Sequence, residues 1–458
     1  MTRKKWNAPT AVVLSFAAIC LMAATREPVV VEKLPNILLI LTDDQGYHDV
    51  GYYGTKDLRT PHIDQIAKNG IRFDNFYANC PVCSPTRAAL LTGNYPDVVG
   101  VPGVIRTYPE DNWGYLSPKG PLLPAMLRKK GYHTAIIGKW HLGLESPNTP
   151  NERGFEYFHG WLGDMMDDYW AHRRHDINYM RENEKVIDPK GHATDLFTQW
   201  SQDYIKKQAK SKRPFFLYLA YNAPHTPVQP PQEWLEKVRK REPGIDEKRA
   251  RLVALIEHMD DGIGKVTQTL KEEGLYENTL IIYSSDNGGH LPSMANNGAL
   301  RDGKQSMYEG GLRVPTCMSW PARIQAGRIS VQPNVSMDLY PTLLQLVRLE
   351  AKGEDGRSFL PTLMNADAQE KQEERELYFT RREGGMDYAG MSSYCLRKGK
   401  WKLVKNAPHK PMELFDMEND KAEKHNVIAE NPEVYKELNK LLMRHIQEGG
   451  RVPWQKPH

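Results

Sequence analysis

Short polar clusters follow the apolar runs of this 458-residue chain and supply side chains that could do hydrolytic chemistry. Asp43 and Asp44 come directly after one apolar run, and Asp286 and Asn287 follow a later one. Four oxygen-bearing side chains, without a thiol or an imidazole among them, suit a hard cation such as calcium or magnesium. Each pair alone is more often a turn or a helix cap. Their joint placement predicts a metal site.

Cys83 carries the most reactive side chain of the sequence and begins the segment CSPTRAALLTG at residues 83–93. Pro85 suits the first turn of a helix, and the residues from Arg87 onward are good helix formers. The unpaired N–H groups and the dipole of a helix N-terminus favour a bound anion. An unmodified thiol in that position is expected to be a nucleophile with a lowered pKa.

The cysteine pattern leaves another interpretation of residue 83 open. Cys80 and Cys83 form a C-x-x-C pair, which alone would suit a redox pair or half of a zinc site. No second C-x-x-C and no matching histidine pair follows in the sequence. With Cys317 and Cys395 added, the cysteines are still too few for a disulfide scaffold, so the residues around Cys83 must decide its role.

The segment from Cys83 resembles the C-x-P-x-R signature of the formylglycine-dependent sulfatases, in which that cysteine is oxidised to an aldehyde before folding. Thr86 stands where many members carry a second serine. Three more segments resemble motifs of this family: GKWHLG at 138–143, APHTP at 223–227 and GKQSMYEGG at 303–311. The resemblance is strongest to the branch with arylsulfatase A and N-acetylgalactosamine-6-sulfatase, and to exported bacterial sulfatases that act on polysaccharides.

The resemblance implies a role for each matching residue. It names the catalytic residues Cys83, Arg87, Lys139, His141, His225 and Lys304. It also implies one calcium ion, held by Asp43, Asp44, Asp286, Asn287 and the modified Cys83. In the implied mechanism, one hydroxyl of hydrated formylglycine attacks sulfur while Arg87, Lys139 and Lys304 hold the sulfuryl oxygens. His225 protonates the leaving alcohol, and His141 takes a proton from the second hydroxyl so that sulfate is expelled.

Two other functions remain open on the sequence. A phosphate mono- or diesterase of the same superfamily is the nearer one, although its two-zinc members carry Asp-His-Gly where this chain has Asp286-Asn287-Gly288. A catalytically silent binder of sulfated glycans is the alternative from another class. The complete set of nucleophile, acid, base and metal ligands argues against it.

An aromatic and charged segment at residues 160–175 is the candidate for substrate recognition. Its side chains could stack on sugars and pair with acidic groups, although an ordinary solvated loop can have the same composition. The substrate candidates are His172, Arg173, Arg174, His175 and, in the C-terminal part, Arg382. We expect a sulfated carbohydrate from a glycosaminoglycan or an algal polysaccharide. The resemblance also implies a formylglycine-generating or sulfatase-maturating enzyme as a partner.

Strands and helices alternate along the chain and must position these residues. Continuous apolar runs at 36–41, 215–220 and 280–283 are typical of strands buried on both faces. Helical patterns occur at 61–69, after an N-capping Thr60, and at 122–130, 192–210, 246–272 and 432–448. The alternation predicts an α/β fold with a large, mostly parallel sheet sandwiched by helices, which the resemblance makes alkaline-phosphatase-like. Ligands of such sheets bind at the carboxyl ends of the strands, where the polar clusters fall.

The pattern along the chain predicts three parts. Residues 1–24 read as a signal peptide, because three basic residues precede an apolar run too short to span a bilayer. A buried helix, or a lipid anchor through Cys20, is a weaker interpretation. Residues 33–363 are expected to form the catalytic domain. Residues 370–458, with short alternating segments, are expected to form a smaller α+β subdomain with an antiparallel sheet.

The charge balance limits the partners. With 61 basic and 57 acidic residues, the chain has a formal net charge of +4, part of which lies in the predicted leader. A balance so near neutral gives no support for a nucleic-acid footprint or a polybasic membrane surface. We therefore expect a protein that binds no nucleic acid. The predicted leader indicates export to the periplasm or the exterior, or to a lysosomal-type compartment in a eukaryote, without embedding in a membrane.

Overall fold

The computed structural model describes residues 1–2, 33–108, 111–365, 375–384 and 391–456. The chain from Leu34 to His458 forms one compact unit. The predicted leader at 1–24 lies outside the described residues, apart from its first two positions. Within the described part of the chain, every helix is too short or too polar to cross a membrane.

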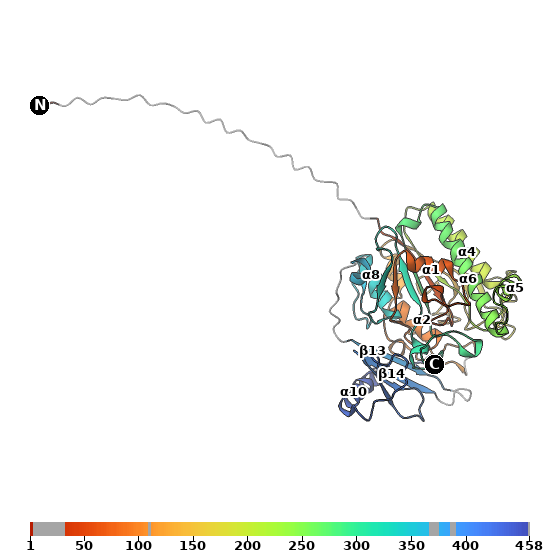
Figure 1. Cartoon of the computed structure of the whole chain (residues 1–458). Coiled ribbons are helices and arrows are strands. Elements are labelled where there is room, and N and C mark those ends of the chain that lie inside the picture. The colour runs from red at the N-terminus through yellow and green to blue at the C-terminus, as the bar shows by residue number, and fades with distance from the viewer. Residues whose placement is uncertain (3–32, 109–110, 366–374, 385–390, 457–458) are drawn as a thin grey trace. The chain divides into compact units, whose positions relative to one another are not determined.

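A ten-stranded sheet forms the centre of this unit, in the order β11-β2-β10-β9-β1-β8-β4-β5-β6-β7 (Figure 1). Its middle strands are parallel: β9 (Thr279–Ser285), β1 (Asn36–Thr42), β8 (Phe215–Ala220), β4 (His133–Lys139) and β5 (Tyr157–Trp161). The outer strands are β6 (Met180–Glu182) and β7 (Lys185–Val186) on one side, and β10 (Thr316–Ser319), β2 (Ile71–Phe73) and β11 (Arg328–Ser330) on the other. Every residue of β1, β8 and β9 is buried, as their unbroken apolar runs require. The mostly parallel sheet is confirmed.

Helices cover this sheet on both sides. Figure 1 shows α4 (Ala193–Ala209), α5 (Gln232–Arg241) and α6 (Glu247–Glu272) together on one side and α8 (Leu339–Leu346) on the other. The other helices near the sheet are α1 (Pro61–Lys68), α2 (Cys83–Thr92), α3 (Leu123–Arg128), α7 (Glu309–Leu312) and α9 (Leu360–Met364). The predicted helices at 61–69, 122–130, 192–210 and 246–272 are confirmed to within two residues at each end.

The N-terminus of α1 is capped differently from the prediction. The Thr60 hydroxyl accepts a hydrogen bond from the Gly51 N–H at 2.7 Å and donates to the Asp64 carboxylate at 2.9 Å, so it does not cap α1. The N–H groups of His62 and Ile63 donate instead to Asp260 of α6, at 3.1 and 2.8 Å. The local pattern failed here because the capping carboxylate stands 198 residues further along the chain than His62.

A four-stranded antiparallel sheet follows in the C-terminal part, as predicted, with strands β13 (Glu376–Arg382), β14 (Ser392–Lys398), β15 (Trp401–Lys405) and β16 (Glu413–Asp416). The predicted final helix is α10 (Pro432–Gly449). Phe379 and Leu403 of this sheet share one apolar cluster with Tyr77 and Ala89. Tyr77 belongs to β3 (Phe76–Tyr77), which pairs with β12 (Asn334–Val335). The sheet is thus packed directly on the part of the chain that carries Cys83.

A buried ion cluster reinforces this contact. Lys402 of β15 is almost fully buried and lies 2.8 Å from Glu309 of α7 and 2.7 Å from Glu423. The Glu309 carboxylate is also 3.0 Å from the guanidinium of Arg313. Burial acts to raise the pKa of Glu309, but Lys402 and Arg313 outweigh it and lower this pKa to about 2. Glu423 therefore depends on Lys402 for its compensation, and Glu309 on Lys402 and Arg313 together.

Replacing Lys402 with methionine should lower the free energy of unfolding by about 3–5 kcal/mol, because it leaves buried Glu423 without its counter-ion and Glu309 with Arg313 alone. Lys400→Met is the matched control, since Lys400 pairs with Asp416 at 2.8 Å near the surface. Loss of that pair should cost less than about 1 kcal/mol. Thermal and chemical denaturation measure both variants. Equal midpoints for the two would contradict the assignment.

Candidate active site

The carboxyl ends of parallel strands bring the polar clusters of the sequence together. Asp43 and Asp44 follow β1, Lys139 is the last residue of β4, and Asp286 and Asn287 follow β9. The backbone N–H of Asp43 donates to the carbonyl of Ala223 at 3.1 Å, which joins the end of β1 to the loop after β8. That loop carries His225. The four strand ends therefore meet at one edge of the sheet, where such folds bind ligands.

Cys83 is the first residue of α2 and follows Val82, whose backbone is extended. Its side chain is buried, and the Sγ atom lies 3.4 Å from Asp43 Oδ1. The Thr86 hydroxyl bonds both the N–H and the carbonyl of Cys80, each at 3.1 Å. The Ser84 hydroxyl accepts the N–H of Ile105 at 3.0 Å. These bonds fix the turn before α2 and hold residue 83 against Asp43.

The thiol of Cys83 is not activated by these surroundings. Burial and the neighbouring carboxylate of Asp43 raise its pKa well above the ordinary value. The expectation of a lowered pKa at this helix N-terminus is therefore wrong for the unmodified thiol, because burial and the charge of Asp43 disfavour the thiolate. Cys80 and Cys83 are both free thiols, without a disulfide between them.

Three cations lie against three carboxylates in this cluster. The pairs are Lys139 with Asp43, Arg87 with Asp286 at 2.6 and 3.1 Å, and Lys304 with Asp44 at 2.7 Å. Arg87 also approaches Asp43 at 3.7 Å. Burial acts to raise the pKa of Asp43, but Lys139, His225 and Arg87 outweigh it and leave this pKa well below the ordinary value. The cluster thus combines anion-holding groups with ligands for a cation.

His225 and Lys304 lie next to each other at the more exposed side of the cluster. The His225 Nε2 atom is 3.1 Å from Lys304 Nζ and 3.5 Å from Asp44 Oδ2. Its Nδ1 atom is 2.7 Å from the carbonyl oxygen of Thr226. Because a carbonyl only accepts, Nδ1 carries the proton, and Nε2 of the neutral ring accepts from the Lys304 ammonium. The side chain of Lys304 is 12% exposed and that of His225 10%, whereas Arg87, Lys139 and Asp43 are fully buried.

His141 offers a basic nitrogen on the buried side. Its backbone is left-handed, with φ of 58°, and its Nε2 atom lies 2.8 Å from the carbonyl oxygen of Ile105. Nε2 is therefore the donor, and Nδ1 is buried without a hydrogen-bond partner among the described residues. Burial, with the charges of Lys139 and Arg87, lowers the pKa of His141 well below the ordinary value. The ring is neutral, with a free lone pair on Nδ1.

The acidic side of the cluster fits a divalent cation. Asn287 donates through Nδ2 to Asp44 Oδ1 at 2.8 Å, while its Oδ1 atom is buried without a hydrogen-bond partner in the described structure. Burial and the charge of Asp43 raise the pKa of Asp286 to about 7, so the carboxylates crowd one another. A cation would satisfy the amide oxygen and relieve this crowding. Oxygen ligands favour a hard ion. The three cation-carboxylate pairs cancel, so a divalent ion would give the cluster a positive excess that suits a sulfate ester.

Potential ligand atoms of Asp43, Asp44, Cys83 and His225 all lie within 4.8 Å of one another. His192, Asp195 and His258 form a second such group. There, His192 accepts the Thr194 N–H through Nδ1 at 3.2 Å, and its Nε2 lies 2.9 Å from the Gln229 carbonyl. Both nitrogens of that ring are already used, so the first group is the better candidate for a metal centre.

Tyr169, an aromatic residue of the 160–175 segment, makes a contact in this site that the sequence did not predict. Its buried hydroxyl lies 2.7 Å from the carbonyl oxygen of Asn222 and 3.0 Å from that of His225. The 160–175 segment is thereby attached to the loop that carries His225. No sequence pattern predicts such a contact, because it joins a side chain to backbone atoms that are distant in the chain.

The substrate candidates are placed in two kinds of surroundings. His172 and Arg382 are buried, and Arg382 lies over the rings of Tyr394 and Trp454. The other three are partly or fully exposed. Arg173 pairs with Asp188 at 2.9 Å, Arg174 pairs with Asp167 at 2.7 Å and Asp164 at 3.2 Å, and His175 stacks on Tyr108. Among the five candidates, these three are the ones whose side chains reach solvent.

The comparison with protein families matches the fold and the geometry of this site. A family model described as Sulfatase matches residues 35–349, which is more than half of the chain. The chain belongs to the Sulfatase family. A second model, described as N-sulphoglucosamine sulphohydrolase, C-terminal, matches residues 301–449 of this sulfatase.

Curated relatives carry the names of individual sulfatases. N-acetylgalactosamine-6-sulfatase of Homo sapiens is 36% identical over 353 residues, covering 72% of this chain and 66% of the relative. Arylsulfatase J of Mus musculus is 35% identical over 321 residues, covering 68% of this chain and 52% of the relative. The match therefore spans slightly less than two thirds of the first of these relatives and about half of the second.

Solved structures cover more of the chain. Ps i-CgsB, in complex with k-i-k-neocarrahexaose, is 31% identical with a TM-score of 0.83 over 93% of this chain and 95% of that one. BT4656, in complex with its substrate D-glucosamine-2-N,6-O-disulfate, has a TM-score of 0.75 at 24% identity over 93% of this chain and 100% of that one. The latter likeness concerns the fold.

Proposed function

We propose that this sulfatase removes sulfate from a sulfated carbohydrate, with a formylglycine made from Cys83 as nucleophile and one calcium ion. The supporting observation is the buried cluster in which Cys83, three cations and an oxygen ligand set converge at one strand edge. The ion would be held by Asp43, Asp44, Asp286, Asn287 and residue 83. The names of the curated relatives and the carrahexaose bound to Ps i-CgsB support a carbohydrate substrate.

Two groups that the chain must acquire supply the remaining chemistry. A bound calcium ion supplies positive charge for the sulfuryl oxygens and acidifies an oxygen ligand at residue 83. The aldehyde of residue 83, when hydrated, supplies one hydroxyl for attack on sulfur and a second one for release of sulfate. Arg87 and Lys139, both fully buried, hold the sulfuryl oxygens where charge develops.

Two histidines would handle protons on opposite sides of the reacting group. His225 and Lys304 lie toward solvent, where the sugar must extend, so they are placed to protonate the leaving oxygen. Because Nε2 of the neutral ring carries no proton, the Lys304 ammonium, which donates to it at 3.1 Å, would first protonate Nε2, and the imidazolium would then pass that proton to the leaving oxygen. His141, buried and neutral with a free Nδ1, is suited to remove the proton that accompanies release of sulfate.

Replacing His225 with glutamine should reduce turnover of a sugar sulfate by about two to four orders of magnitude, since general acid catalysis contributes that much. The loss should be far smaller for 4-nitrophenyl sulfate, whose leaving group needs little protonation. Rates for both substrates measure the effect. His133→Gln is the control, because His133 begins β4 at the end opposite Lys139. Equal losses for both substrates would refute the acid role of His225.

A panel of defined substrates tests the proposed function itself. Sulfate release from sulfated mono- and oligosaccharides should be detected, while matching phosphate esters should be turned over much more slowly. Faster phosphate release would favour the phosphoesterase alternative. Binding of sulfated sugars without any turnover, together with an unmodified thiol at Cys83, would favour the silent binder.

The cellular setting is part of the same proposal. We infer that the leader at 1–24 directs export to the periplasm, the exterior or a lysosomal-type compartment. A formylglycine-generating or sulfatase-maturating enzyme would act on Cys83. Because Cys83 is only 3% exposed in the folded chain, that enzyme must meet the residue before folding is complete.

A further inference from the structure

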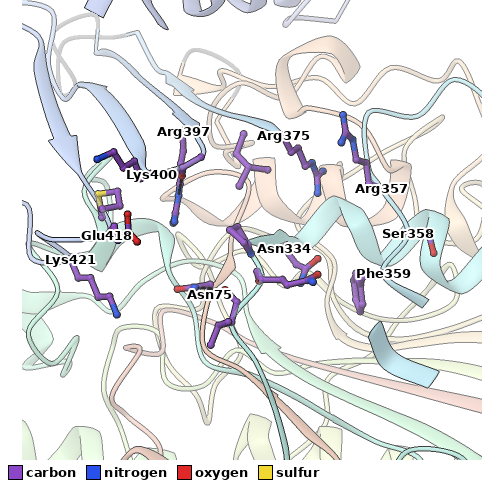
Figure 2. A pocket seen from close by; sticks show the side chains of 16 residues that line it. Asn75, Asn334, Arg357, Ser358, Phe359, Arg375, Arg397, Lys400, Glu418 and Lys421 are labelled. Atoms are coloured by element: carbon purple, nitrogen blue, oxygen red, sulfur yellow. Dashed lines mark hydrogen bonds between the residues drawn. The ribbon is translucent and has the colours of Figure 1, made fainter. Parts of the chain in front are cut away.

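A hollow of about 810 Å³ lies apart from the candidate active site, between the four-stranded sheet and two segments of the larger part of the chain (Figure 2). The segments are 331–334 and 357–359, and the sheet contributes residues of β13 and β14 and of the turns that follow β14 and β16. None of the residues that line the hollow belongs to the catalytic or metal cluster. It is therefore a separate feature of the surface.

Cations dominate the lining of this hollow. They are Arg357, Arg375, Arg397, Lys400 and Lys421, against the single carboxylate of Glu418. In Figure 2, Arg357 and Arg375 lie at one end, Lys400 and Lys421 at the other, and Arg397 between them. Such a row matches an extended ligand with several negative charges better than a single small anion.

Two of these cations are held in fixed positions. Both guanidinium nitrogens of Arg375 bind the carboxylate of buried Asp338, each at 2.6 Å. Arg397 donates through Nη1 to the hydroxyl of Tyr77, a residue of the buried core. Neither side chain must be ordered anew when a ligand binds, which reduces the entropic cost of binding.

Two other cations remain available to a ligand. Arg357 and Lys421 are exposed, and neither side chain has an ion pair or hydrogen bond within the described part of the chain. Lys400 pairs with Asp416 at 2.8 Å. Counting Asp338, Asp416 and Glu418 against the five cations leaves the hollow with an excess of positive charge.

The uncharged part of the lining includes buried apolar side chains and a partly exposed amide. Phe359 and Met417 are 2% and 3% exposed, so they present almost no apolar surface, and the partly exposed amide of Gln332 offers hydrogen bonds to hydroxyl groups. A nucleic acid would also match the positive charge, but Phe359, the one aromatic side chain among the described lining residues, is 2% exposed and gives bases no ring to stack on.

We propose that this hollow is a second binding site for anionic carbohydrate, which holds sulfate or carboxylate groups of a substrate chain away from the catalytic centre. The inference rests on the proposed function for the choice of ligand. It predicts that affinity rises with chain length beyond what the catalytic centre can contact, and that the gain depends on Arg357 and Lys421.

Calorimetric titration of Cys83→Ala protein with a chondroitin sulfate disaccharide and octasaccharide tests this proposal, because binding is then read without turnover. The additional double variant Arg357→Glu/Lys421→Glu should weaken octasaccharide binding at least about tenfold, as two charged contacts of this kind are lost. Disaccharide binding should stay unchanged. The neutral pair Arg357→Gln/Lys421→Gln, measured in the same way, should show a smaller loss in the same direction.

Lys206→Glu/Lys207→Glu is the matched control, since these exposed lysines of α4 change the net charge equally at another place. The proposal fails if this control weakens octasaccharide binding as much, if the Arg357/Lys421 variants bind normally, or if a DNA oligonucleotide of similar charge binds more tightly than the octasaccharide.

In otherwise wild-type protein, the Arg357/Lys421 variants should hydrolyse 4-nitrophenyl sulfate at the normal rate. Absence of hydrolysis in wild-type protein would instead count against the proposed function, while the binding data would still decide the second site.

Discussion

Protein with Cys83 replaced by alanine should lose sulfate ester hydrolysis by about three orders of magnitude or more, because the nucleophile of the reaction is removed. The surroundings of residue 83 are the physical reason. Its thiol has a raised pKa, so an unmodified cysteine would be a poor nucleophile there, whereas an oxygen nucleophile beside Asp43 and a cation would not depend on thiol ionisation. Initial rates on a sugar sulfate measure the loss. Mass spectrometry of the peptide that bears residue 83 should show an aldehyde in the active protein.

Cys80→Ala is the matched control for this experiment. Cys80 is also a buried free thiol, three residues earlier in the C-x-x-C pair, and its backbone rather than its sulfur bonds Thr86. Its replacement should leave activity within a few-fold of the original protein. A C-x-x-C function would be indicated if both variants were equally inactive. Full activity with an unmodified thiol at residue 83 would refute the formylglycine proposal.

Calcium should stabilise the folded protein, and its removal by a chelator should abolish turnover. At a calcium concentration one hundred times the dissociation constant, the free energy of unfolding should rise by about 2.7 kcal/mol. Replacing Asn287 with alanine should reduce this gain, because the buried Oδ1 atom without a partner is the expected ligand. Asn287 is preferable to an aspartate for this test, since its loss leaves no buried cation unpaired. Denaturation with and without calcium provides the measurement.

Asn148→Ala is the control for the metal experiment. Asn148 is a buried asparagine outside the cluster, and it donates to the carbonyl of Leu116 at 2.8 Å. Its loss should lower stability in the absence of metal but keep the full gain from calcium. If magnesium stabilised the protein and calcium did not, the identity of the ion would be wrong. Equal gains in the Asn287 variant and the original protein would remove Asn287 from the ligand set.

The sequence predicted those parts of the fold that depend on residues close together in the chain, such as apolar runs and helix caps. Five of the six residues at 36–41 are apolar, which favours a strand buried on both faces, and the run is part of β1. The helix at 246–272 begins after Asp246, whose carboxylate does accept first-turn N–H groups. The convergence of Asp43 with Asp286 could also be expected, because ends of parallel strands share an edge of the sheet.

The parts that could not be predicted depend on side chains that meet across long distances in the chain. Asp260 caps α1, and Lys402 compensates Glu309, yet neither pair has a pattern in the sequence. The raised pKa of the Cys83 thiol has the same origin, because the degree of burial is a property of the whole packed core. The roles given to the individual site residues and the boundary between 363 and 370 stay predictions.

The hydroxyl of Tyr169 divides the 160–175 segment into a fixed base and a variable tip. Exposed side chains at the tip, such as Trp170 and His175, can change without moving the loop of His225, whereas loss of the Tyr169 hydroxyl would disturb both at once. Under the proposed function, copies of such a gene could diverge toward different sugars by substitution at the tip alone, with the loop of His225 left in place.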